Sequence, residues 1–158
     1  MTTSTTKYFD DLQIGERFVT EARTVTLADV ETWVTLLGAP GEMFTDYEYA
    51  SQKSVFGRPV VPAFMVQAFA DALLGQQQTL VESTVALLGS HMRALAPLFV
   101  GDTMHVEVEI SGKKRSSKPD RGVVTLLYTM SNQDGQAIMS ANSTVMMWRR
   151  PDLVLTEG

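Results

Sequence analysis

The second half of the chain alternates between hydrophobic and polar residues, as strands with one solvated face do. The pattern is clearest in residues 102–110, which alternate Thr103, His105, Glu107 and Glu109 with Met104, Val106, Val108 and Ile110. A period of two predicts a half-buried strand. Residues 84–95, 122–130 and 137–148 are predicted as further strands, and the Asp134-Gly135 pair before the last of them is a strong hairpin signal.

Apolar residues in the first half recur at steps of three and four, which is the spacing of a helix. Residues 60–74 carry the longest such run, and a helix so widely apolar should be covered nearly all round. A second, amphipathic helix begins after Thr26, with Asp29 in its first turn, and ends at Gly38 and Pro40. Two shorter elements are a strand at residues 17–25 and a short helix at residues 46–53.

One long helix followed by consecutive antiparallel strands predicts an α+β fold in which a curved sheet wraps the helix. The 158 residues show no internal repeat and no low-complexity linker, so a single domain over residues 1–158 is expected. Residues 1–7 are polar and predict a flexible tail rather than a signal peptide.

Composition narrows the range of partners. A net charge of −5 and a pI of about 5.0 give no electrostatic reason to expect nucleic acid or an anionic membrane as partner. The most apolar stretch, residues 60–74, is shorter than the ~20 residues of a membrane span. The absence of cysteine excludes disulfides and thiolate nucleophiles, and we expect a cytoplasmic protein.

A segment between the amphipathic helix and the long one carries a family signature. Residues 36–50 read Leu-Leu-Gly-Ala-Pro-Gly-Glu-Met-Phe-Thr-Asp-Tyr-Glu-Tyr-Ala. This segment resembles the signature of the MaoC-like, (R)-specific enoyl-CoA hydratase family, with matches at Gly38, Asp46, Tyr49 and Ala50. Phe-Gly-Arg-Pro-Val at residues 56–60 and Lys-Pro-Asp-Arg-Gly at residues 118–122 extend the resemblance over most of the chain.

The resemblance implies a hotdog fold and an acyl-CoA or acyl-carrier thioester as ligand, with no further cofactor. In hotdog proteins two sheets usually join edge to edge. The chain is therefore expected to form a homodimer, or a heteromer with a catalytically complete hotdog subunit.

The family's catalytic pair is replaced in this sequence. Hydration of an enoyl thioester needs a base and an acid, which an Asp and a His supply in the relatives. Those positions fall on Ala39 and Phe44, and the family's His-Gly at the start of the long helix falls on Pro62-Ala63. We expect a non-catalytic subunit of a heteromeric hydratase or an enzyme with altered chemistry. The alternatives are a thioesterase that uses an acid on the central helix, and a non-catalytic scaffold that binds acyl thioesters.

Several residues are candidates for a remaining site. In the relatives a backbone N–H near Gly57 faces the thioester carbonyl, although a simple turn would also explain this glycine. Asp71 on the long helix, His91 on the strand after it, and the acids Glu42 and Asp46 are candidates for proton transfer. A surface or structural role is the simpler interpretation of each of these four.

A basic cluster lies between two of the predicted strands. It consists of Lys113, Lys114, Arg115, Lys118 and Arg121. These side chains could bind the phosphates of coenzyme A, as the resemblance implies for basic loops of this fold, or form a solvated hairpin. No metal site is predicted, because the two histidines lie on different strands.

Overall fold

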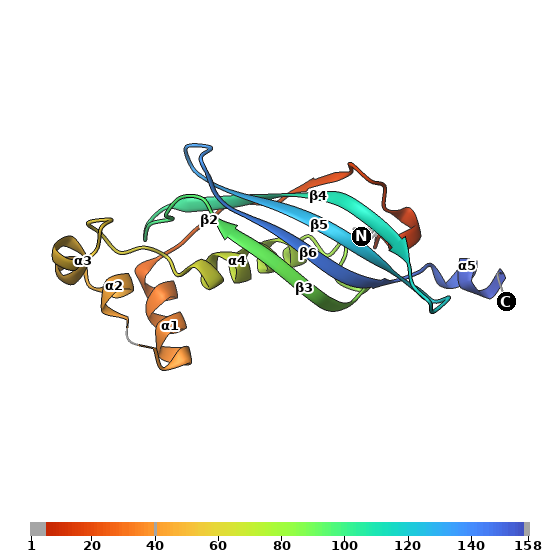
Figure 1. Cartoon of the computed structure of the whole chain (residues 1–158), viewed down its shortest axis with the longest axis horizontal. Coiled ribbons are helices and arrows are strands. Elements are labelled where there is room, and N and C mark those ends of the chain that lie inside the picture. The colour runs from red at the N-terminus through yellow and green to blue at the C-terminus, as the bar shows by residue number, and fades with distance from the viewer. Residues whose placement is uncertain (1–5, 40, 157–158) are drawn as a thin grey trace, which may run out of the picture.

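A long, curved antiparallel sheet covers one side of a central helix in the computed structural model, which describes residues 6–39 and 41–156 (Figure 1). Within these residues the strand order is β1-β4-β5-β6-β3, and β2 pairs with β4 as well. The strands are β1 (Arg17–Val19), β2 (Arg23–Thr24), β3 (Thr84–Ala94), β4 (Thr103–Arg115), β5 (Arg121–Asn132) and β6 (Ala137–Trp148).

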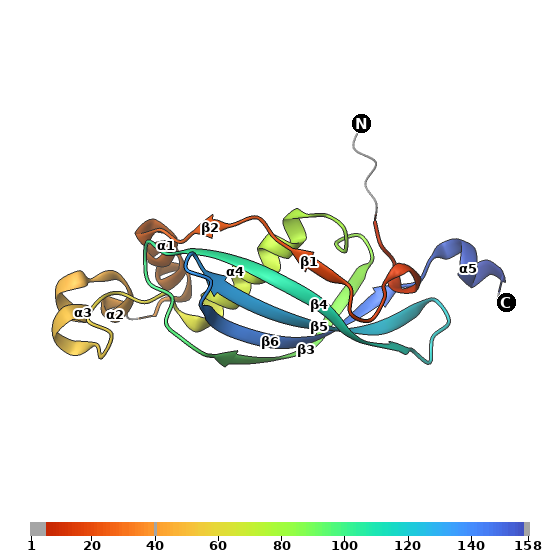
Figure 2. The same ribbon diagram turned by 90° about the horizontal axis from the view of Figure 1, so that it is seen from above.

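The helices are placed at the two ends of the sheet and beneath it. Helix α4 lies under the sheet, α1 to α3 gather at one end, and α5 lies at the other end (Figures 1 and 2). Their bounds are η1 (Phe9–Asp11), a 3-10 helix, then α1 (Leu27–Leu37), α2 (Glu42–Thr45), α3 (Tyr47–Lys53), α4 (Ala63–Gln76) and α5 (Pro151–Thr156). The α+β arrangement predicted from the sequence is confirmed.

The strand predictions hold, with two differences at the ends. Strand β4 runs five residues past the predicted end at Ile110, because its pairing with β5 continues to Arg115 opposite Gly122. The strand predicted at residues 17–25 is divided into β1 and β2. Between them the Thr20 N–H still donates to the Val106 carbonyl at 2.9 Å, but the Val106 N–H donates to the Thr20 hydroxyl at 3.0 Å instead of to a backbone carbonyl.

Helix ends follow the predicted capping chemistry. Thr26 caps α1, its side chain accepting the Asp29 N–H, and Gly38 ends the helix in the left-handed conformation at φ 62°. Pro40, the other predicted stop, lies outside the described residues. Helix α4 begins at Ala63 rather than at residue 60, because Pro62 is its N-cap.

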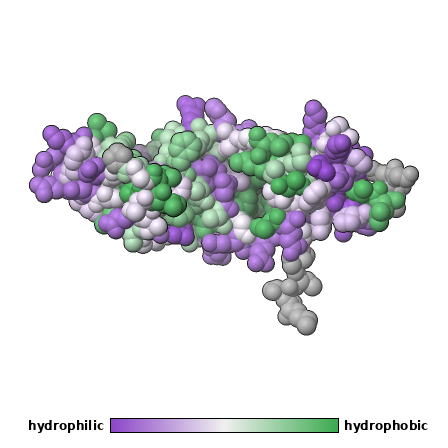
Figure 3. Space-filling view, turned by 90° about the horizontal axis from the view of Figure 1, so that it is seen from below, coloured by the Kyte–Doolittle hydropathy of each residue, from purple (hydrophilic) through white to green (hydrophobic). Residues whose placement is uncertain are grey.

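One chain covers only one side of α4. Five of its side chains face the sheet and are buried: Met65, Val66, Ala70, Leu73 and Leu74. On the other side Ala63 and Ala72 are exposed, and Phe64 keeps 74% of its surface open. Figure 3 shows hydrophobic patches on this lower face of the molecule. A single chain therefore does not enclose α4 on all sides, although this was expected for so apolar a helix.

The start of the described chain is anchored. The Lys7 N–H donates to the Thr79 carbonyl at 2.8 Å, and the Thr6 hydroxyl donates to Glu82 at 2.8 Å. Residues 6 and 7 are therefore fixed to the segment that follows α4, although they were predicted to belong to a tail. Residues 1–5 of that predicted tail lie outside the described residues.

The ring of Phe9 packs directly onto Gly122, and this contact predicts an effect on stability. A Cβ at residue 122 would lie 2.4 Å from two carbons of the ring. We expect Gly122→Ala to lower the free energy of unfolding by about 1–3 kcal/mol through overpacking, measured by urea denaturation. Gly89→Ala is the control, because a Cβ there meets nothing within 4 Å. Equal midpoints for the two variants would contradict the prediction.

Candidate functional site

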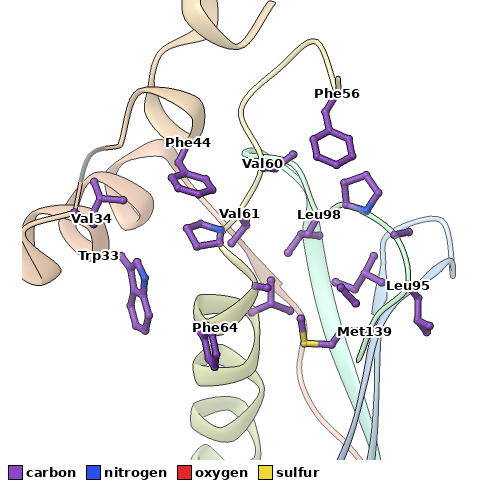
Figure 4. Close-up of a pocket in the computed structure, with 18 of the residues that line it drawn as sticks. Trp33, Val34, Phe44, Phe56, Val60, Val61, Phe64, Leu95, Leu98 and Met139 are labelled. Carbon is purple, nitrogen blue, oxygen red and sulfur yellow. The ribbon is translucent and has the colours of Figure 1, made fainter. Parts of the chain in front are cut away.

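An apolar cavity of about 610 Å³ opens where α1, α2 and the start of α4 meet the sheet. Every described residue that lines it is alanine, valine, leucine, isoleucine, methionine, proline, phenylalanine or tryptophan. In Figure 4 Trp33 and Phe44 lie on one side of this cavity, Leu98 and Met139 on the other, and Phe64 on the first turns of α4. A concave site of this size accepts a small organic ligand, and its lining selects a hydrophobic one.

The two residues predicted to stand at the positions of the family's catalytic pair both line this cavity. Ala39, which follows α1, and Phe44 on α2 line it, and so do Pro62 and Ala63 at the start of α4. None of these side chains can take up or release a proton. The described lining therefore holds a hydrophobic group without offering an acid or a base.

The polar groups that remain are backbone N–H groups at the start of α4. Ala63 and Phe64 are the first residues of this helix, where N–H groups have no partner within the helix. Neither finds an acceptor among the described residues, whereas the next two N–H groups, of Met65 and Val66, donate to the Pro62 carbonyl. These two donors, with the positive end of the helix dipole, suit a carbonyl oxygen of a ligand.

Gly57 does not fit the role expected for it. Its N–H donates to the Ser54 carbonyl at 3.1 Å, and it is absent from the cavity lining. Its φ of 70° lies in the left-handed region, which explains the glycine by the turn alone. The donors at the start of α4 replace it as candidates. Their signal in the sequence was Pro62, which marks a helix start.

Three of the proton-transfer candidates lie away from the cavity. Asp46 caps α3 by accepting the Tyr49 N–H at 2.9 Å, and Glu42 is exposed on α2. His91 pairs with Asn142 in the sheet, three residues from the cavity-lining Ala94. Because side chains alternate along a strand, His91 points to the face opposite the cavity.

Asp71, the fourth candidate, lines a separate cavity of about 380 Å³ between α4 and the sheet. It shares this wall with Tyr128 of β5, which the sequence analysis did not single out. Desolvation raises the pKa of Asp71 although the residue is exposed, and hydrogen bonds from Gln67 and Tyr128 partly oppose this. Burial, followed by the charge of Asp71, raises the pKa of the Tyr128 phenol. No described residue lines both cavities.

The basic cluster lies at the opposite end of the sheet from the first cavity (Figure 2). Lys113 donates to the Leu12 carbonyl, and burial lowers its pKa. Arg121 forms an ion pair with Asp120 at 2.8 Å and stacks on Trp148. Lys114, Arg115 and Lys118 are exposed. Within one chain, the predicted phosphate-binding residues and the cavity are therefore not brought together.

Residues 6–39 and 41–156 hold no group of three or more His, Cys, Asp or Glu side chains that could bind a metal ion. No helix among them is both long and apolar enough to cross a membrane.

A sheet wrapped around a helix, with an apolar cavity at the N-terminal end of that helix, defines a hotdog domain whose cavity has the size and lining that suit a hydrophobic ligand. The fold agrees with a Mycobacterium tuberculosis protein of double hotdog fold, with a TM-score of 0.80 at 22% identity over 93% of this chain and 46% of that one. The chain belongs to the MaoC-like family, since the MaoC like domain matches residues 11–132.

Three further proteins resemble this chain. Mesaconyl-CoA hydratase of Cereibacter sphaeroides is 29% identical over 95% of this chain and 43% of its own length. The monoamine oxidase regulatory protein of Archaeoglobus fulgius superposes with a TM-score of 0.85 at 31% identity, over 92% of this chain and 97% of that one. An (R)-hydratase from A. caviae superposes with a TM-score of 0.71 at 26% identity, over 85% of this chain and 96% of that one. The chain spans less than half the length of the curated relative.

Proposed function

We propose that this chain binds an acyl thioester, holding the acyl group in the apolar cavity, and that it carries out no proton transfer itself. It is then the non-catalytic half of a hydratase whose other half is a catalytically complete hotdog domain. The observation that carries the proposal is the lining of the cavity, which is apolar throughout its described residues and includes Ala39 and Phe44, the two residues that the resemblance aligns with the family's acid and base. The hydratases among the relatives support a thioester as ligand.

The start of α4 is the proposed binding position of the thioester carbonyl. With the N–H groups of Ala63 and Phe64 donating to its carbonyl oxygen, the acyl chain extends between Trp33 and Met139. Burial of each methylene group contributes about 0.8 kcal/mol. Such a site favours a ligand with an uncharged acyl group, because an unpaired charge in this lining would lose its hydration.

Exposed hydrophobic surface supports a second hotdog domain as partner. Strand β3 is at the edge of the sheet, so its outer backbone groups have no strand beside them among the described residues. Leu87 and Leu88 on this strand keep 58% and 51% of their surfaces exposed, and Phe64 of α4 keeps 74%. An unprotected edge beside apolar side chains is suited to pairing with another sheet.

Trp33 provides the test, because it lines the cavity while Trp148 lies at the other end of the sheet. In a Trp148→Phe background we expect crotonyl-CoA and a longer enoyl-CoA to change the Trp33 fluorescence saturably. The conjugated thioester absorbance should stay constant. Hydration by the chain alone, at rates typical of competent relatives, would overturn the proposal. A binding chain that gains no activity with any complete hotdog partner is a scaffold instead.

Thioester hydrolysis is the second candidate function, and the environment of Asp71 favours it. A carboxylate with a raised pKa is a better general base near neutral pH than an ordinary one. In that case free thiol is released from acyl-CoA, and Asp71→Asn abolishes the release while keeping an acceptor for Gln67 and Tyr128. Thiol release that is absent, or unchanged in Asp71→Asn, rejects this alternative.

A further inference from the structure

Arg58 lies next to the aromatic residues at one side of the apolar cavity. The guanidinium carbon of Arg58 lies 3.6 Å from the centroid of the Phe99 ring. Phe56 meets the same ring edge-on, with centroids 6.5 Å apart at 77°, and Phe56 lines the cavity. Arg58 is thus separated from the cavity wall by aromatic rings, and it is exposed to solvent.

Backbone bonds fix the segment that carries Arg58. Val60 forms an isolated antiparallel bridge with Phe99, and the Val61 N–H donates to the Leu98 carbonyl at 2.7 Å. On the other side the Val100 N–H donates to the Pro59 carbonyl at 3.2 Å. The guanidinium is therefore held on a rigid loop, stacked on a ring, before any ligand arrives, which reduces the entropy lost on binding.

Arg58 is paired with no carboxylate within the described part of the chain. None of the ion pairs or side-chain hydrogen bonds there involves this residue. By contrast, five other arginines pair with carboxylates: Arg17, Arg23, Arg121, Arg149 and Arg150. In a protein of net charge −5, a fixed cation that pairs with none of these acids is free for an anionic ligand.

We infer that Arg58 binds a phosphate group of the carrier on which the acyl thioester is presented. This inference rests on the proposed function. The cavity lining is apolar, so the charged part of the ligand stays outside it, on the rim where Arg58 is held. A guanidinium fork matches the geometry of a phosphate, and stacking leaves its N–H groups free to donate.

The distance along the chain fits a carrier arm. From Arg58 to Ala63, where the thioester carbonyl is proposed to lie, the chain advances five residues, which span at most about 18 Å. A pantetheine arm is long enough to connect a thioester and a phosphate that lie within this limit. Arg58 thereby replaces the basic hairpin, which lies at the other end of the sheet, as the phosphate contact.

Two ligands and two variants test the assignment. Octanoyl-CoA carries the phosphates, and the octanoyl thioester of N-acetylcysteamine has the same acyl group without them. We expect Arg58→Gln to weaken octanoyl-CoA about 10-fold or more at low ionic strength, and to leave the cysteamine thioester unchanged. The control is Lys114→Gln/Lys118→Gln in the hairpin, which should alter neither affinity. Affinities are measured by Trp33 fluorescence or calorimetry.

The remaining outcomes separate the two proposals. If Arg58→Gln and the natural chain bind octanoyl-CoA equally well, or if the hairpin variant alone weakens it, the role of Arg58 is rejected while the proposed function stands. Equal weakening of both ligands by Arg58→Gln also rejects it, because the acyl site would then be disturbed. If the natural chain binds neither thioester, the proposed function fails and this inference fails with it.

Discussion

We expect the double variant Ala39→Asp/Phe44→His to hydrate enoyl-CoA about 10²–10⁴-fold faster than the natural chain. Both positions line the cavity in which the thioester is proposed to bind, so each new group faces the ligand. The Asp supplies a base for water, and the imidazole supplies an acid for the α-carbon. The backbone donors of Ala63 and Phe64 are already placed for the enolate oxygen.

The control for this gain is Ala39→Asn/Phe44→Gln, which introduces polar amide side chains that cannot transfer protons at ordinary pH. The rate is followed as the loss of conjugated thioester absorbance, with circular dichroism to confirm folding. Equal rates for the two double variants, both folded and both binding crotonyl-CoA, would show that these positions do not decide catalysis. Gly41, which lies between the two substituted positions, stays unchanged, because a Cβ there would lie 3.0 Å from a methyl group of Val34.

Replacing Arg149 by methionine removes a buried cation and lowers the free energy of unfolding by about 3–5 kcal/mol. The side chain of Arg149 is 3% exposed, and its Nε lies 3.0 Å from an oxygen of Asp10. A second guanidinium nitrogen donates to the Pro119 carbonyl at 3.1 Å. The arginine thus joins η1, the β4-β5 connection and the end of β6, and its loss leaves Asp10 without its cation.

The neighbouring arginine is the matched control. The side chain of Arg150 is 49% exposed and lies 3.6 Å from Asp11. Exposed pairs are worth little, so Arg150→Met should change stability by no more than about 1 kcal/mol. For a chain of this length the Arg149 variant should lower Tm by roughly 6–20 °C in calorimetry. Similar Tm values for the two variants would contradict the prediction. Adding Asp10→Leu to Arg149→Met should recover part of the loss.

Local chemistry explains which elements could be predicted. The alternation in residues 102–110 and the capping by Thr26 depend on neighbours along the chain, and the structure confirms both. The division of the first predicted strand depends on Thr20 meeting Val106, which is 86 residues away. No local pattern carries such a contact. For the same reason the pairing of Asp71 with Tyr128 could not be anticipated.

The candidate site also has residues that the sequence placed correctly and residues that it did not. Ala39 and Phe44 were identified by their places in a family signature, and the structure brings both to one cavity. Gly57 was assigned by the resemblance of residues 56–60, yet its N–H donates to the Ser54 carbonyl. His91 lies on the far face of the sheet, and the basic hairpin lies at the far end. Type and spacing of residues do not report which way a side chain points or which ends of strands meet.

By itself the sequence determined the α+β fold and the family, and it predicted that Ala39 and Phe44 replace the acid and the base, because periodicity and signature positions are properties of the chain alone. Only the tertiary structure decided that these residues share an apolar cavity with the free N–H groups of α4, and that Arg58 rather than the hairpin stands at its rim. The direction in which a side chain points, and its distance from other side chains, depend on packing between segments that are remote in sequence. No single segment encodes that packing.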